Sequence, residues 1–257
     1  MIIAAWNIQR AGNLESHNWE TAARAALAWS HIWEWVVTVG NDTPHLQPAL
    51  IFLAEATLVG GPSLVQALNF DTAFSATHEA TFYGTKTSSC SFILVLKKNT
   101  FSDQAQLIGA TTQRPYLKIS TKEWALAGMH MIANRKKSMS EILDALNDLT
   151  TAEKPSKTGK HICLIGDMNY DLKNMDQADF TALEDIGFTA HEPGINKTYQ
   201  HKKNPGKYND VIDFCIVSSG TRPQPFTVLN SQYKDWDNID HAPIFYDIPF
   251  TMDEGDF

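Results

Sequence analysis

The stretch from His161 to Leu172, H-I-C-L-I-G-D-M-N-Y-D-L, constrains the fold of this chain most. Ile162 to Ile165 is a short apolar run stopped by Gly166, which is typical of a buried strand followed by a turn. Asp167 and Asn169 come next, where α/β folds place ligands. The carboxylate can hold a hard cation, and the amide can donate to a phosphate oxygen or orient a water. Because Gly, Asp and Asn are also ordinary turn residues, this stretch alone fits a polar turn as well as a site.

Other short apolar runs predict further strands. These runs are Ile2 to Ile8, Ala49 to Leu53, Ser91 to Leu96, Leu117 to Ser120 with its hairpin partner Trp124 to Met129, Val211 to Ser218, and Ile244 to Ile248. Helices are predicted over Trp19 to Val39, around Ser63 to Leu68, from a cap at Ser138 or Ser140 to about Leu149, and over Ala178 to Ile186. After the second helix we expect an irregular segment through Lys86, and later in the chain a basic, exposed loop over Lys197 to Lys207.

Polar residues recur at or near the ends of these runs. Asn7 lies near the end of the first run, and a lone Asn there is usually a strand terminator. Glu55 follows the second run, and an unpaired buried charge is expensive, so it needs a salt bridge or a metal. His130 follows the hairpin, and Asp240-His241 precedes the last run. Asp213 is the oddest placement, because it falls inside an otherwise apolar run.

Composition limits the class of protein. At 257 residues the chain fits one large α/β unit as well as two domains. A formal net charge of −8 argues against a general nucleic-acid coat protein, but not against an enzyme whose acidic residues hold cations. No apolar run reaches membrane-span length, so we expect a soluble protein, and Met1 to Trp6 lacks the pattern of a signal peptide. The three cysteines, Cys90, Cys163 and Cys215, are expected to be buried free thiols.

Six elements in order resemble the endonuclease/exonuclease/phosphatase superfamily, typified by deoxyribonuclease I and the abasic-site endonucleases. They are Trp6-Asn7, Glu55, His130, Gly166-Asp167-Met168-Asn169, Asp213 and Asp240-His241. A second set looks like the catalytic subunit of cytolethal distending toxins, namely the N-terminal W-N-I-Q, Glu15 to Trp19, Arg114-Pro115 and His130 to Asn134. The resemblance implies one domain over residues 1–257. Its fold would be a four-layered α/β sandwich, with two packed mixed β-sheets flanked by helices and the site at one end between the sheets.

The resemblance also implies a metal site. Glu55 and Asp240 would be the main ligands, with Asn7 and Asp167 completing the shell. Oxygen ligands of this kind suit Mg²⁺, with Mn²⁺ or Ca²⁺ as substitutes.

The resemblance implies the remaining roles as well, and they agree with what phosphoester hydrolysis needs, which is an activated water and stabilisation of a charged transition state. Asp213 and His241 would form a dyad in which the imidazole takes a proton from water, with Asp167 beside them in the catalytic group. His130 would donate to a phosphate oxygen or act as the acid, and Asn169 would orient the water or phosphate. The phosphate contacts would be Arg114, Asn134 and Asn7.

One departure from the family concerns His130. Deoxyribonuclease I pairs its first catalytic His with a Glu, in a strand that corresponds roughly to residues 90–96 here. This chain has Ser88, Ser89, Cys90 and Ser91 in that region and no carboxylate, so the orientation of His130 is open.

Three functions are open at this point. The first is a divalent-metal-dependent endonuclease that nicks DNA without reading sequence, as a genotoxin would, with delivery subunits as partners. Its basic residues would grip backbone phosphates, and they are Lys97, Lys98, Arg135 to Lys137 and Lys202 to Lys207. The second is a phosphatase acting on phosphoinositides or other phosphomonoesters. The third is a catalytically inactive protein that only binds a partner, against which the complete set of site residues argues.

Overall fold

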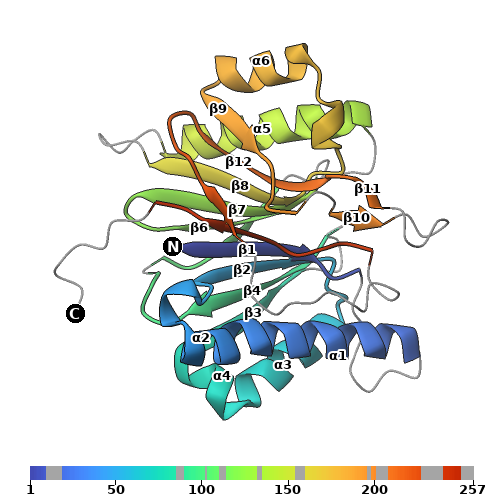
Figure 1. The fold of residues 1–257 in the computed structure, drawn as a ribbon, viewed down its shortest axis with the longest axis vertical. Coiled ribbons are helices and arrows are strands. Elements are labelled where there is room, and N and C mark those ends of the chain that lie inside the picture. The colour runs from blue at the N-terminus through green and yellow to red at the C-terminus, as the bar shows by residue number, and fades with distance from the viewer. Residues whose placement is uncertain are drawn as a thin grey trace.

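Two mixed β-sheets lie face to face with helices on both outer sides (Figure 1). The computed structural model describes residues 1–9, 19–84, 90–101, 103–109, 114–131, 135–153, 160–195, 198–200, 208–226 and 240–249. Within these ranges each of the two sheets has six strands, and a short two-stranded sheet is separate from them. The four-layered sandwich expected from the sequence is therefore confirmed.

The first sheet has the strand order β13-β14-β1-β2-β4-β3. Its strands are β1 (Ile2–Asn7), β2 (Leu50–Ala54), β3 (His78–Tyr83), β4 (Phe92–Lys97), β13 (Gln224–Phe226) and β14 (Ile244–Asp247). β1 and β2 are parallel, whereas the other neighbours are antiparallel. The N-terminal strand therefore lies at the centre of a sheet whose other strands come from both ends of the chain.

The second sheet has the order β5-β6-β7-β8-β12-β9. Its strands are β5 (Gln106–Ile108), β6 (Tyr116–Ser120), β7 (Trp124–His130), β8 (His161–Asp167), β9 (Phe188–His191) and β12 (Asp213–Ser218). Only β7 and β8 are parallel among these pairings. The short sheet pairs β10 (Tyr199–Gln200) with β11 (Tyr208–Asp210).

Helices cover the outer face of each sheet (Figure 1). On the first sheet lie α1 (Trp19–Trp33), the π-helical turn η1 (Glu34–Thr38), α2 (Val39–Asp42), α3 (Gly60–Phe70) and α4 (Thr72–Thr77), with a 3₁₀ turn η2 (Pro44–Leu46) before β2. On the second lie α5 (Arg135–Glu153) and α6 (Gln177–Asp185), with a 3₁₀ turn η3 (Leu172–Asn174) after β8. None of the helices in the described ranges is both long enough and apolar enough to span a membrane.

Three buried apolar clusters hold the layers together. Alternate residues of β1 show why: Ile2, Ala4 and Trp6 belong to the cluster beneath the helices, whereas Ile3 and Ala5 belong to the cluster between the sheets. A central strand covered on both faces reads as a continuous apolar run, because neither face meets water. The third cluster joins the second sheet to α5 and α6. The single domain predicted over residues 1–257 stays a prediction.

Three local expectations need correction. The segment expected to be irregular through Lys86 contains α4 and the edge strand β3, where Glu79 and Thr81 are exposed and alternate with buried residues. The segment expected to be a loop over Lys197 to Lys207 contains the short strand β10 at Tyr199–Gln200. Asp213 is the first residue of β12 and does not lie in mid-strand, because Val211 and Ile212 donate or accept hydrogen bonds outside that strand.

Candidate active site

Strand register brings the polar strand ends to one place. In the second sheet His130 and Asp213 are both direct partners of Asp167, one on each side of β8. In the first sheet Asn7 is the partner of Ala54, which Glu55 follows. The amide nitrogen of Asn7 donates to Asp167 Oδ2 across the gap between the sheets, over 3.0 Å. The predicted residues of both sheets therefore meet at one end of the sandwich.

Asp167 is the centre of this group. It is 2% exposed, and its Oδ2 lies 3.5 Å from His130 Nε2 and 3.6 Å from His241 Nε2. Its Oδ1 accepts a hydrogen bond from the backbone amide of Asn169 over 2.8 Å. Burial raises the pKa of Asp167, while the two imidazoles and the hydrogen bond from Asn7 oppose that rise. A buried carboxylate supported by this many donors is a prepared ligand for positive charge.

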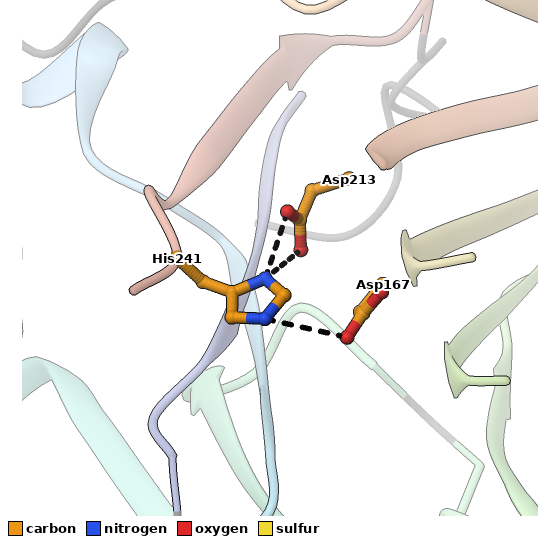
Figure 2. A group of neighbouring side chains, drawn as sticks. All are labelled: Asp167, Asp213 and His241. Carbon is orange, nitrogen blue, oxygen red and sulfur yellow. Dashed lines mark hydrogen bonds and ion pairs between the residues drawn. The ribbon is translucent and has the colours of Figure 1, made fainter. Parts of the chain in front are cut away.

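Asp213 and His241 form the predicted pair, which Figure 2 shows beside Asp167. The Nδ1 atom of His241 lies 3.0 Å from one carboxylate oxygen of Asp213 and 3.2 Å from the other. Both residues are buried, with 1% and 6% exposure. Since a carboxylate only accepts, Nδ1 carries a proton and the ring presents Nε2 toward Asp167.

The charge state of His241 follows from its surroundings. Burial alone would lower the pKa of this imidazole, but the carboxylates of Asp213, Asp167 and Asp240 together raise it to about 10. The ring is therefore an imidazolium at neutral pH in the protein without a cation. The expected base role stays a prediction, and a cation held by Asp167 and Asp240 would offset these charges and lower the pKa of His241.

Two residues to which the sequence analysis assigned no role, Thr198 and Trp6, hold this pair in place. The Thr198 hydroxyl accepts hydrogen bonds from the backbone amides of Ile212 and Asp213, over 3.0 and 2.9 Å. Its carbonyl accepts from Ala242 over 2.7 Å, so one buried residue ties the segment of Asp213 to that of His241. The indole of Trp6 donates to the backbone carbonyl of His241 over 2.9 Å. Thr198 lies in the loop predicted to be basic and exposed, which gave no reason to select it.

His130 is held between the two sheets. Its Nε2 lies 2.7 Å from Arg114 Nη1 and 3.2 Å from Glu55 Oε1. Arg114 also donates to the carbonyl of Met131 over 2.7 Å. On the opposite side of the ring, Nδ1 lies 3.5 Å from the sulfur of Cys90. Arg114, predicted as a phosphate contact, is therefore in the site and next to the predicted acid.

The backbone is strained where the site residues lie. Gln9, Glu55 and Asn169 have left-handed conformations, with φ of 51°, 59° and 48°. Such conformations cost about 1–3 kcal/mol each and cluster at functional sites. Gly166 has a φ of 140°, and a Cβ there would lie 2.1 Å from the carbonyl oxygen of Met129. The glycine that stops the apolar run is therefore required by the close approach of β7.

Two arrangements in this site could receive a cation. Asp167, Asp213 and His241 each offer an atom within 4.8 Å of the others, so this buried group could hold a metal ion (Figure 2). In the present geometry, however, the two ring nitrogens face different carboxylates, and an imidazolium has no lone pair for a metal. The predicted set instead offers the carboxylates of Glu55, Asp167 and Asp240 together with the side-chain oxygen of Asn7.

Asn7 as placed supports its neighbours. Its amide nitrogen donates to Asp167, and its carbonyl oxygen accepts from the backbone amide of Gln9 over 3.0 Å. Gln9 in turn accepts from the backbone amide of Asp240 over 3.2 Å. Asn7 thus links two predicted metal ligands, and the metal and phosphate roles predicted for it stay predictions. Asn169 likewise uses its side-chain amide to donate to Met131 over 2.8 Å.

The basic residues predicted to bind DNA phosphates either lie far from Glu55 along the sheet or have side chains outside the described part of the structure. Lys97 is the last residue of β4 and Lys98 follows it, at the end of β4 that pairs with the start of β2, so both lie at the opposite end of the sheet from Glu55. The contacts with DNA backbone phosphates predicted for these two lysines stay a prediction. Asn134 and Lys202 to Lys207 lie outside the described residues, as do the side chains of Arg135 to Lys137.

The cysteine prediction is confirmed. Cys90, Cys163 and Cys215 are buried and none forms a disulfide with another. All three belong to the cluster between the sheets. Burial raises the pKa of Cys90 to about 12, so its side chain is a neutral thiol at physiological pH.

Comparison with known proteins finds similar folds among solved structures. No family model and no curated protein sequence matches the chain. Among solved structures, the chain is similar to a mannosyl-6-phosphatase from Bacteroides thetaiotaomicron, with 14% identity and a TM-score of 0.63 over 97% of this chain and 100% of that one. An endonuclease/exonuclease/phosphatase family protein from the same organism has 14% identity and a TM-score of 0.61, over 96% and 97%.

A third similar structure is the Haemophilus ducreyi cytolethal distending toxin, with 13% identity and a TM-score of 0.55 over 95% of this chain and 96% of that one. These likenesses and the paired six-stranded sheets agree with what the six sequence elements indicated. The chain therefore has the deoxyribonuclease I-like fold of the endonuclease/exonuclease/phosphatase superfamily.

Proposed function

We propose that this protein is a divalent-metal-dependent phosphoester hydrolase, and that its substrate is the phosphodiester backbone of DNA, cut without sequence preference. The observation that carries the proposal is the meeting of His130, His241 and Asp213 with Asp167 and Glu55 at one end of the sheets. A buried dyad beside a carboxylate cluster suits hydrolysis of an anionic ester, because that reaction needs a positioned proton carrier and compensation of negative charge.

The donor set fits a hard cation. Glu55 and Asp240 would hold it, with Asp167 and Asn7 completing the site. Their side chains offer oxygen atoms, and a cation would balance the negative charge of the buried Asp167. Mg²⁺ is the ion we propose, with Mn²⁺ or Ca²⁺ as substitutes. When bound, the ion would polarise the phosphate and neutralise charge on the leaving oxygen.

The protein's own residues have separate tasks in this proposal. Asp213 holds the proton on His241 Nδ1, which leaves Nε2 as the atom that exchanges a proton with water. His130 Nε2 donates to a phosphate oxygen or to the leaving group, and Arg114 beside it binds the phosphate with its planar N–H groups. Asn169 fixes the orientation of Asp167 through its backbone amide.

A second candidate is a phosphomonoester phosphatase on the same scaffold. The likeness to a mannosyl-6-phosphatase supports it, at a TM-score of 0.63. The net charge of −8 also favours a small phosphorylated substrate over a polyanion at low salt. We keep DNA first because the sequence resembles the toxin branch. A role as a genotoxin with delivery subunits belongs to that same proposal.

The test is nicking of supercoiled plasmid with Mg²⁺ and with EDTA, in parallel with phosphate release from a soluble inositol phosphate and a sugar 6-phosphate. His130→Ala and His241→Ala should each abolish activity. His45→Ala is the matched control, because that exposed histidine precedes β2 at the end far from Glu55. Nicking equal in the double variant and the wild type would attribute the activity to a contaminant, and phosphate release without nicking would replace DNA by a phosphomonoester.

A further inference from the structure

A thiol faces the imidazole of His130 from the opposite sheet. Cys90 precedes β4 in the first sheet, whereas His130 ends β7 in the second. The Cys90 sulfur lies 3.5 Å from His130 Nδ1, within reach of a hydrogen bond to sulfur. Both side chains are buried, with 5% and 4% exposure. This contact therefore bridges the two sheets directly beside the site.

The partners on the other ring nitrogen define which hydrogen bond the thiol makes. Arg114, 2.7 Å from Nε2, can only donate, so a neutral His130 accepts there and carries its proton on Nδ1. Glu55, 3.2 Å from the same Nε2, can only accept, so that contact needs a proton on Nε2, which either the imidazolium or the neutral Nε2–H tautomer would supply. In the neutral Nδ1–H ring that Arg114 favours, and in the imidazolium, Nδ1 is the donor and the Cys90 sulfur is positioned to accept its proton.

The Cys90 side chain also contacts Glu55, which is a predicted metal ligand. The backbone of Glu55 forms a hydrogen bond with the Cys90 side chain. Glu55 is one of the strained residues, with a φ of 59°. A single thiol therefore contacts both the ring of His130 and the backbone that carries Glu55.

We propose that Cys90 is a positioning residue for the reaction: its sulfur accepts the hydrogen bond from His130 Nδ1 and so keeps Nε2 turned toward the site, where the protonated ring donates to the substrate phosphate. The proposal rests on the proposed function for its kinetic consequence, although not for the hydrogen bond itself. Because the thiol is neutral, Cys90 supplies orientation and neither a charge nor a nucleophile.

The first test needs no substitution. Long-range ¹H–¹⁵N NMR of the ring nitrogens, assigned with His130→Ala, distinguishes the two tautomers of His130. We expect the neutral ring to be the Nδ1–H tautomer in the wild type. An Nε2–H ring in the wild type would overturn the proposal, whatever the protein hydrolyses.

The second test compares variants of two buried thiols. Cys90→Ala should lower kcat for nicking by about 10- to 100-fold, a fraction of what acid–base groups contribute, with KM for DNA within about twofold. Cys90→Ser, which keeps an acceptor, should recover most of the loss. Cys163→Ala is the matched control, since Cys163 is fully buried in the same cluster between the sheets.

Several results would contradict the proposal. One is a Cys90→Ala variant that keeps both the wild-type kcat and the wild-type tautomer of His130. Another is a loss of kcat in Cys163→Ala equal to that in Cys90→Ala. A third is a folded Cys90→Ser variant whose kcat is no higher than that of Cys90→Ala. If the wild type hydrolyses neither DNA nor phosphomonoesters, the proposed function fails. The tautomer measurement still decides the role of Cys90 in that case.

Discussion

Replacing Asp213 with Asn tests the buried pair with His241 without changing its shape. The substitution keeps the volume of the side chain but removes the charge that lies 3.0 Å from Nδ1. Asp213 is the first of the charges that raise the pKa of His241 against the opposing effect of burial. The variant should therefore lower both the free energy of unfolding and its dependence on pH.

The size of the effect follows from the pKa. A rise in the pKa of His241 from 6.5 to about 10 corresponds to about 4–5 kcal/mol at about 1.4 kcal/mol per unit. This stabilisation is fully present below pH 6.5, where folded and unfolded chains both carry the proton. It is lost as the pH rises through about 10, because the unfolded chain releases its proton first. Asp213→Asn should therefore cost about 3 kcal/mol at pH 6, with the difference from wild type narrowing toward pH 10.

Urea unfolding followed by tryptophan fluorescence measures this, since the chain has seven tryptophans. Wild type and variant should be compared between pH 6 and pH 10 in EDTA, so that no cation competes for the carboxylates. Asp185→Asn is the control, because that carboxylate is exposed at the end of α6. A difference below about 1 kcal/mol at pH 6, or one that does not change up to pH 10, would refute the reasoning.

Three further substitutions address other parts of the fold. Burial lowers the pKa of His78 to about 4, so the unfolded chain takes up a proton first as the pH falls below 6.5. The free energy of unfolding of the wild type, measured in urea, should therefore fall by about 2–3 kcal/mol between pH 7 and pH 4.5, and that of His78→Gln should fall less. Thr198→Val leaves two buried amides without their acceptor and should cost about 2–4 kcal/mol in the same assay, whereas Thr198→Ser should cost less than half of that. Gly166→Ala forces a methyl group onto the Met129 carbonyl and should lower the melting temperature by about 10 °C, compared with a smaller drop for Gly187→Ala, whose methyl meets open space. Equal losses in the paired variants would show that neither the hydroxyl of Thr198 nor the crowding at Gly166 is responsible.

The sequence was informative wherever a residue's position along its own strand decides its place. Gly166 and Asp167 could be located because an apolar run ends there, and residues at the ends of neighbouring strands share one edge of a sheet. Glu55 and His130 followed from the same rule. Periodicity also predicted the helix ending near Gly187, which the structure has as α6.

The parts that escaped prediction depend on contacts between segments far apart in the chain. The hydrogen bond between Cys90 and His130 crosses the gap between two sheets, and no spacing in the sequence reports it. Thr198 acts through backbone amides of another segment, so its residue type alone carries no signal. Asp213 seemed to lie in mid-strand because Val211 and Ile212 are apolar, yet these two residues leave the ladder to bond with the segment after β8.

The most direct measurement is a crystal structure of the protein soaked with Mn²⁺ and a nucleotide, with the ion located by its anomalous scattering. We predict an ion about 2.0–2.3 Å from carboxylate oxygens of Glu55 together with Asp167 or Asp240. His241 should still face Asp213 in that structure. An ion bound instead by Asp213 and a His241 ring turned toward it, with Glu55 out of contact, would contradict the proposed site.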